Sequence, residues 1–449
     1  MSFPKYPAYK DSGVEWLEEV PEHWQPIPFK YIADFVNGMA FKPEQWSEVG
    51  VPIIRIENLN NGEDFNFYVG QVASRYHVNT GDLLFGWSGN RGTSFGPFLW
   101  KRNGLHYLNQ HIFRIVYFKC DKKWLYWTLR AVTKTIEDQA HGIIGMVHVT
   151  KGKLGGVKIP AIPLREQTQI ARFLDHETAR IDKMIEEQQR LIELLKEKRQ
   201  AVISHTVTKG LDPTVPMKDS GLEWLGEVPS HWSVVPFGLA FGYQEGPGIM
   251  AFDFRDEGVP LVRISGVQGR WVTLQGCNYL DPAKANGKWS HFQLERGDLI
   301  ISGSASMGLV SEVGEEAAGA VPYTGLIRLT AKSGISDRDF IRSVVGSYQF
   351  FAQIDLLKAG STIQHFGPTH LSQMKIVLPP LDEQIMLASY VDEISVQFDQ
   401  LLGEAERTND LLQERRSALI SAAITGKIDV RGWQPRANAP SIELAQEAM

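Results

Sequence analysis

The most regular pattern of apolar and polar positions lies between residues 164 and 208. Apolar side chains recur there at steps of three and four residues, with charged ones between them, at Ile170, Leu174, Ile181, Met184, Leu191, Leu195 and Val202. A second stretch keeps a seven-residue repeat through Leu387, Val391, Ile394, Phe398, Leu401, Ala405, Leu412 and Leu419. Such spacing places the apolar side chains on one face of a helix. The pattern therefore predicts two long helices.

Both helices carry matching start and stop signals. A proline stands at the first turn, a glutamate just inside it and a glycine at the far end, namely Pro163, Glu166 and Gly210 in the first helix and Pro380, Glu383 and Gly426 in the second. About 43 residues at ~1.5 Å per residue give a rod of ~65 Å. A narrow seam over so many turns favours pairing of the two helices. The alternative is that each lies on the core of its own domain.

Short runs rich in β-branched and aromatic residues precede each long helix. They lie at 51–56, 81–87, 111–118, 258–264, 297–302 and 326–330, and they alternate with helical patterns near 122–139 and 336–357. This mixture predicts α+β domains. From about Arg431 the chain has no periodicity, and we expect a loose tail there.

An internal duplication organises the chain. Residues 10–29 align without gaps to residues 218–237 and are identical at 14 of 20 positions. At the same offset GVPIIRI (50–56) matches GVPLVRI (258–264). At an offset of 217, PLREQ (163–167) matches PLDEQ (380–384) and KEKRQAVIS (196–204) matches QERRSALIS (413–421). The two copies share their ends and diverge in their middles.

Composition narrows the class of protein. The 449 residues carry a net charge of −6, yet residues 30–160 hold 16 Lys and Arg against 10 Asp and Glu. One basic domain in a neutral to acidic framework allows a polyanion to bind the first half. Two cysteines are too few for a disulfide framework and indicate a reducing cytosol, and no apolar run is long enough to span a membrane. We expect a cytoplasmic protein.

The usual motifs of catalysis are missing from the sequence. It has no phosphate-binding GxxxxGK[ST] loop, no GxGxxG after a strand, no His and Cys residues at metal-ligand spacing and no Asn-Pro-Pro-aromatic tetrapeptide. Asp121 and Lys123 resemble part of a nuclease site without its upstream acid. The pairs Gly81-Asp82 and Gly297-Asp298 read as turns. His23 and His231, each beside a Trp, read as packing residues.

The divergent middles offer binding chemistry instead. The glycine- and serine-rich segments at 87–97 and 302–314 each follow a predicted strand, and a second pair at 142–153 and 360–370 precedes the long helices. Arg, Asn, Gln, Ser, Thr and His in such loops can hydrogen-bond base edges and phosphates. Surface loops without a ligand have the same composition, so the signal is weak by itself.

These segments together resemble a known family. The repeated GxEWLxEVPxHW segment, the stretch at 37–59, LNQHIFRI at 108–115 and the PLxEQ-led helices, in this order and twice over, are similar to the DNA-specificity subunit of type I restriction–modification systems. The resemblance covers roughly residues 1–430. It departs mainly in the second copy, where YTGLIRL (323–329) replaces LNQHIFRI.

The resemblance implies an architecture with pseudo-two-fold symmetry. Two target-recognition domains (1–160 and 213–375) are joined by two long spacer helices (161–212 and 376–427) packed as an antiparallel coiled coil, followed by the tail (428–449). The seam would include Leu174, Ile181, Leu195, Val202, Val391, Phe398, Leu412 and Leu419. Each domain would read one half of an asymmetric site in double-stranded DNA.

The resemblance also implies a division of labour among subunits. The chain would have no catalytic residue, metal or cofactor of its own; two methyltransferase subunits would bind S-adenosylmethionine, and restriction subunits would use ATP and Mg²⁺. Two rivals remain open: a self-contained restriction or modification enzyme, and a coiled-coil scaffold or carbohydrate-binding protein whose 12 Trp stack on sugars.

DNA recognition makes the polar and basic loop residues candidate contacts. In the first domain they are Lys42, Arg55, Asn58, Ser88, Asn90, Arg91, Thr93, Lys101, Arg102, Gln110, His148, Lys151 and Lys153. In the second domain they are Arg263, Ser302, Ser304, Ser306, Ser361, Thr362, Gln364 and His365.

Overall fold

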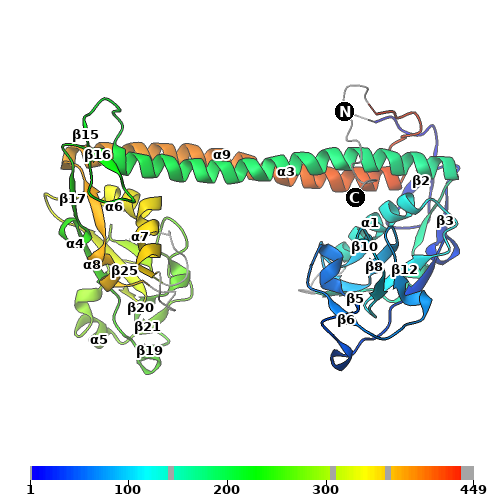
Figure 1. Cartoon of the computed structure of the whole chain (residues 1–449), viewed down its shortest axis with the longest axis horizontal. Helices are drawn as coiled ribbons and strands as arrows, with labels where there is room; N and C mark the ends of the chain where they lie inside the picture. Colours follow the sequence, from blue (N-terminus) through cyan, green and yellow to red (C-terminus); the bar gives the residue numbers. More distant parts are fainter. Residues whose placement is uncertain (1–2, 140–145, 304–309, 359–365, 436–449) are drawn as a thin grey trace. The chain divides into compact units, whose positions relative to one another are not determined.

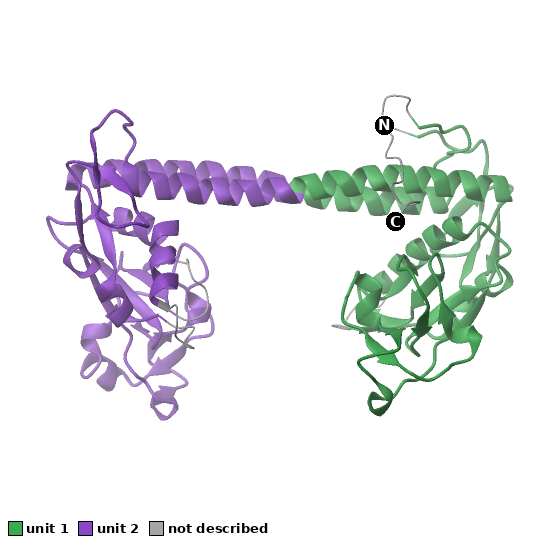
Figure 2. Ribbon diagram, in the orientation of Figure 1, with its two compact units in different colours: residues 1–188, 408–449 green, residues 189–407 purple. Residues whose placement is uncertain are grey.

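The computed structural model describes residues 3–139, 146–303, 310–358 and 366–435. The chain forms two compact units, which we call unit 1 (residues 1–188 and 408–449) and unit 2 (residues 189–407), as Figure 2 shows. Each unit contains one α+β domain and a part of each long helix. The predicted class, two similar α+β domains on long helices, is confirmed.

The two long helices are α3 (Leu164–Lys209) and α9 (Leu381–Ile424), labelled in Figure 1. Each begins directly after a proline and ends within two residues of a glycine in the left-handed region, Gly210 at φ +78° or Gly426 at φ +76°. Glycine adopts this conformation without steric cost, so both predicted stop signals end their helices.

Within each unit the two helices pair in antiparallel fashion. In unit 1, Arg416 donates to the two carboxylate oxygens of Asp182 at 2.6 and 3.2 Å. In unit 2, Arg199 donates to Asp399 at 2.8 Å. These residues correspond at the offset of 217, so each helix copy supplies the aspartate in one unit and the arginine in the other. Antiparallel pairing of two copies of one helix produces this exchange.

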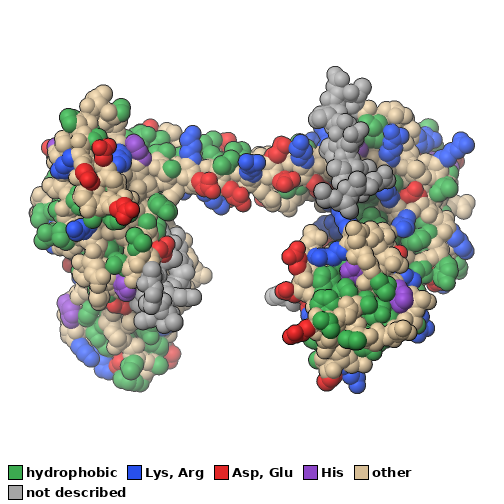
Figure 3. Space-filling view, viewed as in Figure 1, with side chains coloured by type: hydrophobic (Ala, Val, Ile, Leu, Met, Phe, Trp, Pro, Cys, Tyr) green, Lys and Arg blue, Asp and Glu red, His purple; other side chains and the backbone are tan. Residues whose placement is uncertain are grey.

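The predicted seam is mostly correct. Leu174, Ile181, Val391 and Phe398 are buried, and Leu195, Val202, Leu412 and Leu419 are half-buried. Leu191 and Leu401, also expected inside, are 44% and 48% exposed, whereas Leu402 is 9% exposed. Because 3.6 residues per turn do not match a seven-residue repeat, the inward stripe shifts by one position. Lys, Arg, Asp and Glu side chains mix along the outer faces of the helices (Figure 3).

Helix pairing and packing on a domain core both occur, at different parts of each helix. Ile170, Phe173 and Leu174, in the first three turns of α3, belong to the core of unit 1, with Trp24 and Trp124. Leu387 and Ala388 of α9 belong to the core of unit 2. The first and last turns of each helix therefore pack on a domain core, and the turns between them pair with the other helix.

The described part of unit 1 contains two four-stranded sheets and, besides its parts of the long helices, the α-helices α1 and α2. One sheet has the order β10-β8-β12-β4 and the other β6-β5-β11-β7. The strands are β4 (Asp34–Asn37), β5 (Val51–Ile54), β6 (Asn66–Tyr68), β7 (His77–Val78), β8 (Leu83–Gly86), β10 (Gly96–Leu99), β11 (His106–Leu108) and β12 (Ile112–Val116). Helix α1 (Lys122–Gln139) is the predicted one, and α2 (Lys151–Gly156) is short.

Three strand pairs complete unit 1. They are β1 (Tyr9–Asp11) with β2 (Glu19–Pro21), β3 (Gln25–Pro28) with β14 (Lys158–Ala161), and β9 (Ser88–Asn90) with β13 (Met146–His148), all antiparallel. The repeated segment thus forms β1, β2 and β3.

Unit 2 repeats this plan with changes at the sheet edges. Its sheets have the orders β18-β25-β22-β23 and β19-β21-β20-β24, and two pairs join β15 to β16 and β17 to β26. The strands are β15 (Met217–Asp219), β16 (Glu227–Pro229), β17 (Ser233–Pro236), β18 (Phe241–Glu245), β19 (Phe254–Arg255), β20 (Val259–Val262), β21 (Asn278–Leu280), β22 (Leu299–Ser302), β23 (Val310–Glu312), β24 (Val321–Pro322), β25 (Leu326–Ala331) and β26 (Lys375–Leu378). The parallel pair β5–β11 of unit 1 recurs as β20–β24.

The helices of unit 2 differ from the sequence prediction at one point. They are α4 (Phe237–Ala240), α5 (Pro282–Asn286), α6 (Arg338–Val345), α7 (Tyr348–Lys358) and α8 (Pro368–Gln373). The single helical stretch predicted at 336–357 is divided into α6 and α7. Gly346 ends α6, and the Ser347 hydroxyl donates to the Val344 carbonyl at 2.6 Å, which competes with a continuous helix.

The expected loose tail begins later than residue 428. Val430 is fully buried, and the Gln169 amide donates to the carbonyls of Val430 and Trp433 at 3.0 and 2.7 Å. Trp433 packs on Phe173 with ring centroids 5.2 Å apart. The prediction was wrong for residues 428–433, because two apolar residues there cover the start of α3. Residues 436–449 lie outside the described part.

Candidate nucleic-acid interface

A carboxylate at the start of α3 holds the repeated amino-terminal segment of unit 1. Glu166 is 6% exposed and accepts hydrogen bonds from Tyr6 Oη (2.6 Å), His23 Nε2 (2.9 Å) and Trp24 Nε1 (3.2 Å). Burial, together with the hydrogen bond to Glu166, raises the pKa of Tyr6 above its usual range. Three donors thus surround one buried carboxylate.

Unit 2 has the same arrangement with fewer donors. Glu383 at the start of α9 accepts from His231 Nε2 and Trp232 Nε1, both at 2.9 Å. The position equivalent to Tyr6 is Thr214. His23 and His231 are therefore hydrogen-bond donors rather than the simple packing residues predicted. The duplication of both the His-Trp pair and PLxEQ was the sequence signal that could have linked them.

The glutamine that follows each glutamate also has a structural task. Gln167 accepts from the Asp121 N–H at 2.7 Å, and Gln384 accepts from the Asp337 N–H at 2.9 Å. Asp121 and Asp337 accept from the third residues after them, at the starts of α1 and α6, at 2.9 Å. The PLxEQ motif therefore fastens one long helix to one domain helix in each unit.

The residues that resembled enzyme groups have structural partners. Asp121 caps α1, and Lys123 instead pairs with Asp175 at 2.9 Å, so the two do not form a nuclease-like pair. Asp82 accepts from the backbone of its own turn at 2.9 Å, and Asp298 does the same at 2.8 Å, as the turn interpretation predicts. Burial raises the pKa of Asp298.

Metal-ligating groups do not gather within the described residues. No set of three or more His, Cys, Asp or Glu side chains there could hold a metal ion. Cys120 and Cys277 are both free thiols.

Several predicted contact residues of unit 1 come together around β9 and β13. Ser88 in β9 lies opposite His148 in β13, and Asn90 ends β9. The Trp87 ring lies 6.3 Å from the His148 ring, and its indole N–H donates to the Gln110 carbonyl at 2.9 Å. Asn90, Gln110 and His148 are exposed, whereas Ser88 is 1% exposed. We call this the β9–β13 cluster: Trp87, Ser88, Asn90, Gln110, His111 and His148.

Two predicted DNA contacts of unit 1, Asn58 and Arg55, bind to groups of their own loop. Asn58 is 2% exposed; its side chain accepts from the Arg55 N–H at 2.9 Å and donates to the carbonyls of Gly62 and Asp64. Arg55 pairs with Glu57 at 2.8 Å and lowers the pKa of that carboxyl. Asn58 would need to leave its loop to reach DNA.

Other candidates of unit 1 lie at exposed positions. Lys42, Arg91, Thr93, Lys101 and Lys153 are exposed.

Two basic candidates of unit 1 are tied to the backbone. The Lys151 ammonium donates to the Phe35 carbonyl at 2.7 Å. Arg102 donates to the Gly62 carbonyl at 3.1 Å and lies over the Phe65 ring.

The candidates of unit 2 are only partly described. Arg263 donates to Asn278 at 3.0 Å and lies 4.1 Å from the Tyr323 ring centroid. Ser302 is 2% exposed. The remaining candidates, Ser304, Ser306, Ser361, Thr362, Gln364 and His365, lie outside the described residues.

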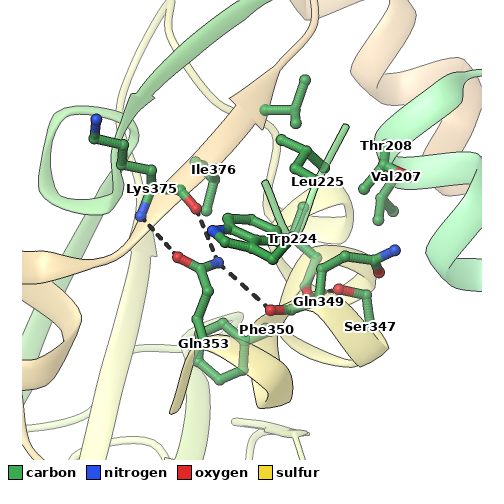
Figure 4. A pocket seen from close by; sticks show the side chains of 12 residues that line it. Val207, Thr208, Trp224, Leu225, Ser347, Gln349, Phe350, Gln353, Lys375 and Ile376 are labelled. Atoms are coloured by element: carbon green, nitrogen blue, oxygen red, sulfur yellow. Dashed lines mark hydrogen bonds between the residues drawn. The ribbon is translucent and has the colours of Figure 1, made fainter. Parts of the chain in front are cut away.

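Two hollows in the described part of unit 2 are lined by residues other than the predicted contacts. Figure 4 shows one under Trp224, where the Gln353 amide accepts from the Lys375 N–H and donates to the Lys375 carbonyl, both at 3.0 Å. A neighbouring groove of about 520 Å³ runs between α3 and α7, lined by Gln200 and Tyr348 among others.

Comparisons with known proteins agree with this architecture. The family model for the type I restriction modification DNA specificity domain matches residues 21–195. The MjaVIII specificity subunit of a type I restriction enzyme from Methanocaldococcus jannaschii is 25% identical over 436 residues, covering 94% of this chain and 97% of that protein. The EcoBI specificity subunit from Escherichia coli is 24% identical, and the match covers 68% of this chain and 65% of that protein.

A solved structure supports the fold. A chain from a study of complex assembly and conformational transition of the type I R-M system superposes with a TM-score of 0.66 at 15% identity, covering 90% of this chain and 98% of that one. None of the described helices is both long and apolar enough to cross a membrane. With the duplicated framework, these matches show that the chain is similar to type I restriction–modification DNA specificity subunits.

Proposed function

We propose that this chain recognises DNA sequence for a type I restriction–modification complex, each unit reading one half of an asymmetric two-part site. The duplication carries this proposal. One framework, in which a glutamate at the start of a long helix accepts hydrogen bonds from a His-Trp pair, presents different loop side chains in its two copies. DNA with two unlike half-sites is the target such a molecule fits.

The shared framework also fits a role in assembly. In this proposal the paired helices set the distance between half-sites, and the two similar frameworks dock two methyltransferase subunits and the restriction subunits. S-adenosylmethionine, ATP and Mg²⁺ belong to those partners, and the complex works in the cytoplasm. The enzyme-like groups of this chain are used in caps and turns, which agrees with a subunit that catalyses nothing itself.

A carbohydrate-binding scaffold is the weaker alternative. Six of the twelve Trp, namely Trp24, Trp100, Trp124, Trp127, Trp232 and Trp289, are buried and unavailable for stacking on a sugar.

Selection from a random pool of duplexes tests the proposal. The full chain, assembled with methyltransferase subunits, is incubated with the pool, and the retained DNA is sequenced. We expect two conserved blocks of different sequence separated by a spacer of fixed length and free composition. A single block, or no enrichment, would contradict the two-reader function. Titration of the chain alone with S-adenosylmethionine should give no binding; saturable binding would favour a self-contained enzyme.

A further inference from the structure

Trp87 joins three segments of unit 1 by main-chain and side-chain hydrogen bonds. Its N–H donates to the His111 carbonyl at 3.2 Å, and its carbonyl accepts from the Val149 N–H at 2.9 Å. Its indole N–H donates to the Gln110 carbonyl at 2.9 Å. Trp87 therefore fixes the backbone that carries Gln110 and His111.

Unit 2 has the same backbone hydrogen bonds at the equivalent position but lacks the side chains of Trp87 and His111. Gly303 donates to the Gly325 carbonyl at 2.8 Å and accepts from the Phe366 N–H at 2.9 Å, which reproduces the Trp87 pattern. Glycines thus replace both Trp87 and His111, and the Glu245 carboxylate accepts from the Gly325 N–H at 3.1 Å. The same place in the fold has different chemistry in the two units.

The side chains of residues 109–111 are arranged unlike those of a purely structural segment. Gln110 is exposed, and its amide nitrogen donates to His111 Nε2 at 3.3 Å. Asn109 Oδ1 and His111 Nδ1 are buried and make no hydrogen bond within the described part of the chain. Unpaired buried polar atoms are costly, so a segment that keeps two of them calls for a functional explanation.

We propose that Gln110 is a base-contacting residue that reads an adenine in one half of the DNA site. His111 orients its amide, and Trp87 fixes its backbone. After the bond to His111, the amide keeps one N–H and its oxygen, and this donor and acceptor match N7 and N6 of adenine in the major groove. Small side-chain rotations on contact would also let Asn109 and His111 find partners. The inference rests on the proposed function and deepens it for unit 1.

Selection from the random pool of duplexes, with the full chain assembled with its methyltransferase subunits, also tests this inference. Gln110→Ala should lower the preference for adenine at one position of one block by about tenfold, and leave the other block unchanged. Gln71→Ala, at another exposed glutamine of unit 1, is the matched control and should leave both blocks intact.

Two variants test the positioning residues. Trp87→Phe removes the indole N–H but not the backbone bonds, and His111→Ala removes the group that orients the amide. Both should weaken the same base preference as Gln110→Ala, with little change at other positions. Loss of all binding with normal unfolding would instead assign these residues a general role.

The outcomes separate this inference from the proposed function. If the wild type selects two blocks and Gln110→Ala selects the same two with equal preference, the inference is overturned and the function stands. If Gln110→Ala weakens the binding of all sequences equally, Gln110 contacts the DNA backbone and not a base, and the inference is again overturned. If the wild type selects no two-part site, the proposed function itself fails.

Discussion

Units 1 and 2 are most alike where the domains meet the long helices and least alike at the ends of their sheets. Both have a glutamate that accepts from a His-Trp pair and a glutamine that accepts from a capping aspartate. They differ at Trp87 and Gly303, although the backbone hydrogen bonds there are the same. The framework thus fixes where a loop lies, and the loop side chains differ freely between copies.

The two units also differ in the side chain that hydrogen-bonds one equivalent backbone carbonyl of the framework. In unit 1 the Trp16 indole donates to the Lys158 carbonyl at 3.0 Å. In unit 2 the equivalent Lys375 carbonyl accepts from Gln353, at 3.0 Å. The same backbone carbonyl is therefore hydrogen-bonded in both units, by a tryptophan in one and a glutamine in the other.

The largest expected effect comes from changing the part that both units share, the paired helices. Adding seven residues to both α3 and α9 keeps the seam in register and lengthens each by ~10 Å. At ~3.4 Å per base pair, the spacer between half-sites should grow by about three base pairs, with both blocks unchanged. Sequencing the DNA selected by the lengthened complex measures this. An active complex with the original spacer would show that helix length does not set the distance.

The hydrogen-bonded carboxylates Glu166 and Glu383 should contribute differently to the stability of their units. Glu166 is buried and has three donors, whereas the side chain of Glu383 is 24% exposed and has two. Glu166→Gln should therefore destabilise unit 1 by about 2 kcal/mol, and Glu383→Gln should cost unit 2 about half of that. Hydrogen exchange of each helix start measures the two effects separately. Equal losses would mean that burial and the extra donor do not matter.

Tyr6, which unit 2 lacks, should make unit 1 sensitive to alkali. Its pKa is raised by burial and by Glu166, so the folded state keeps the proton that the unfolded tyrosine loses near pH ~10. This stability is complete below pH ~10 and is lost as the pH rises further. Tyr6→Phe should cost about 1 kcal/mol at pH 8 and flatten the alkaline loss, as urea unfolding would show. Tyr31→Phe, at a side chain 59% exposed, is the control; an equal alkaline loss in the Tyr6 variant would remove Tyr6 as its source.

The smallest effect concerns single charges on the basic domain. Lys101 and Lys153 are exposed in unit 1. Replacing either with Ala should lower the slope of log affinity against log salt by ~0.9, because one phosphate contact is lost. Lys134, already paired with Asp138 at 2.8 Å, is the control and should leave the slope unchanged. If the salt slope of a lysine variant stays unchanged, as in this control, that lysine does not contact a phosphate.

Sequence patterns predicted the parts of the fold that repeat or that have a clear period. The long helices, their glycine ends, α1 and the main strands follow from apolar spacing and from the duplication. The pattern could not distinguish Leu401 from Leu402 at the seam, because a one-residue shift depends on the exact twist of the helix pair. Nor could it predict that Val430 and Trp433 pack on α3, since a short segment without periodicity shows no sign of a distant partner.

The candidate contacts were harder to predict for a related reason. Residue type identified Asn58 and Gln110 equally well, yet Asn58 is 2% exposed within its loop and Gln110 is exposed. His111 was not selected, although its position beside Gln110 and Trp87 makes it part of the β9–β13 cluster. Burial and hydrogen-bond partners decide between such residues, and both depend on segments far apart in the chain.

The most direct test of the two-reader account is a chain in which one domain occurs twice. Phe29 donates to the Val157 carbonyl at 2.9 Å and Phe237 to the Met374 carbonyl at 2.8 Å, so residues 30–156 can be replaced by residues 238–373 at equivalent framework bonds. Duplex selection with this chain and its partner subunits should return a site whose two blocks are the same sequence in inverted orientation, with the original spacer. Recovery of the original asymmetric site would contradict the account, because the sequence read would then not belong to the exchanged domain.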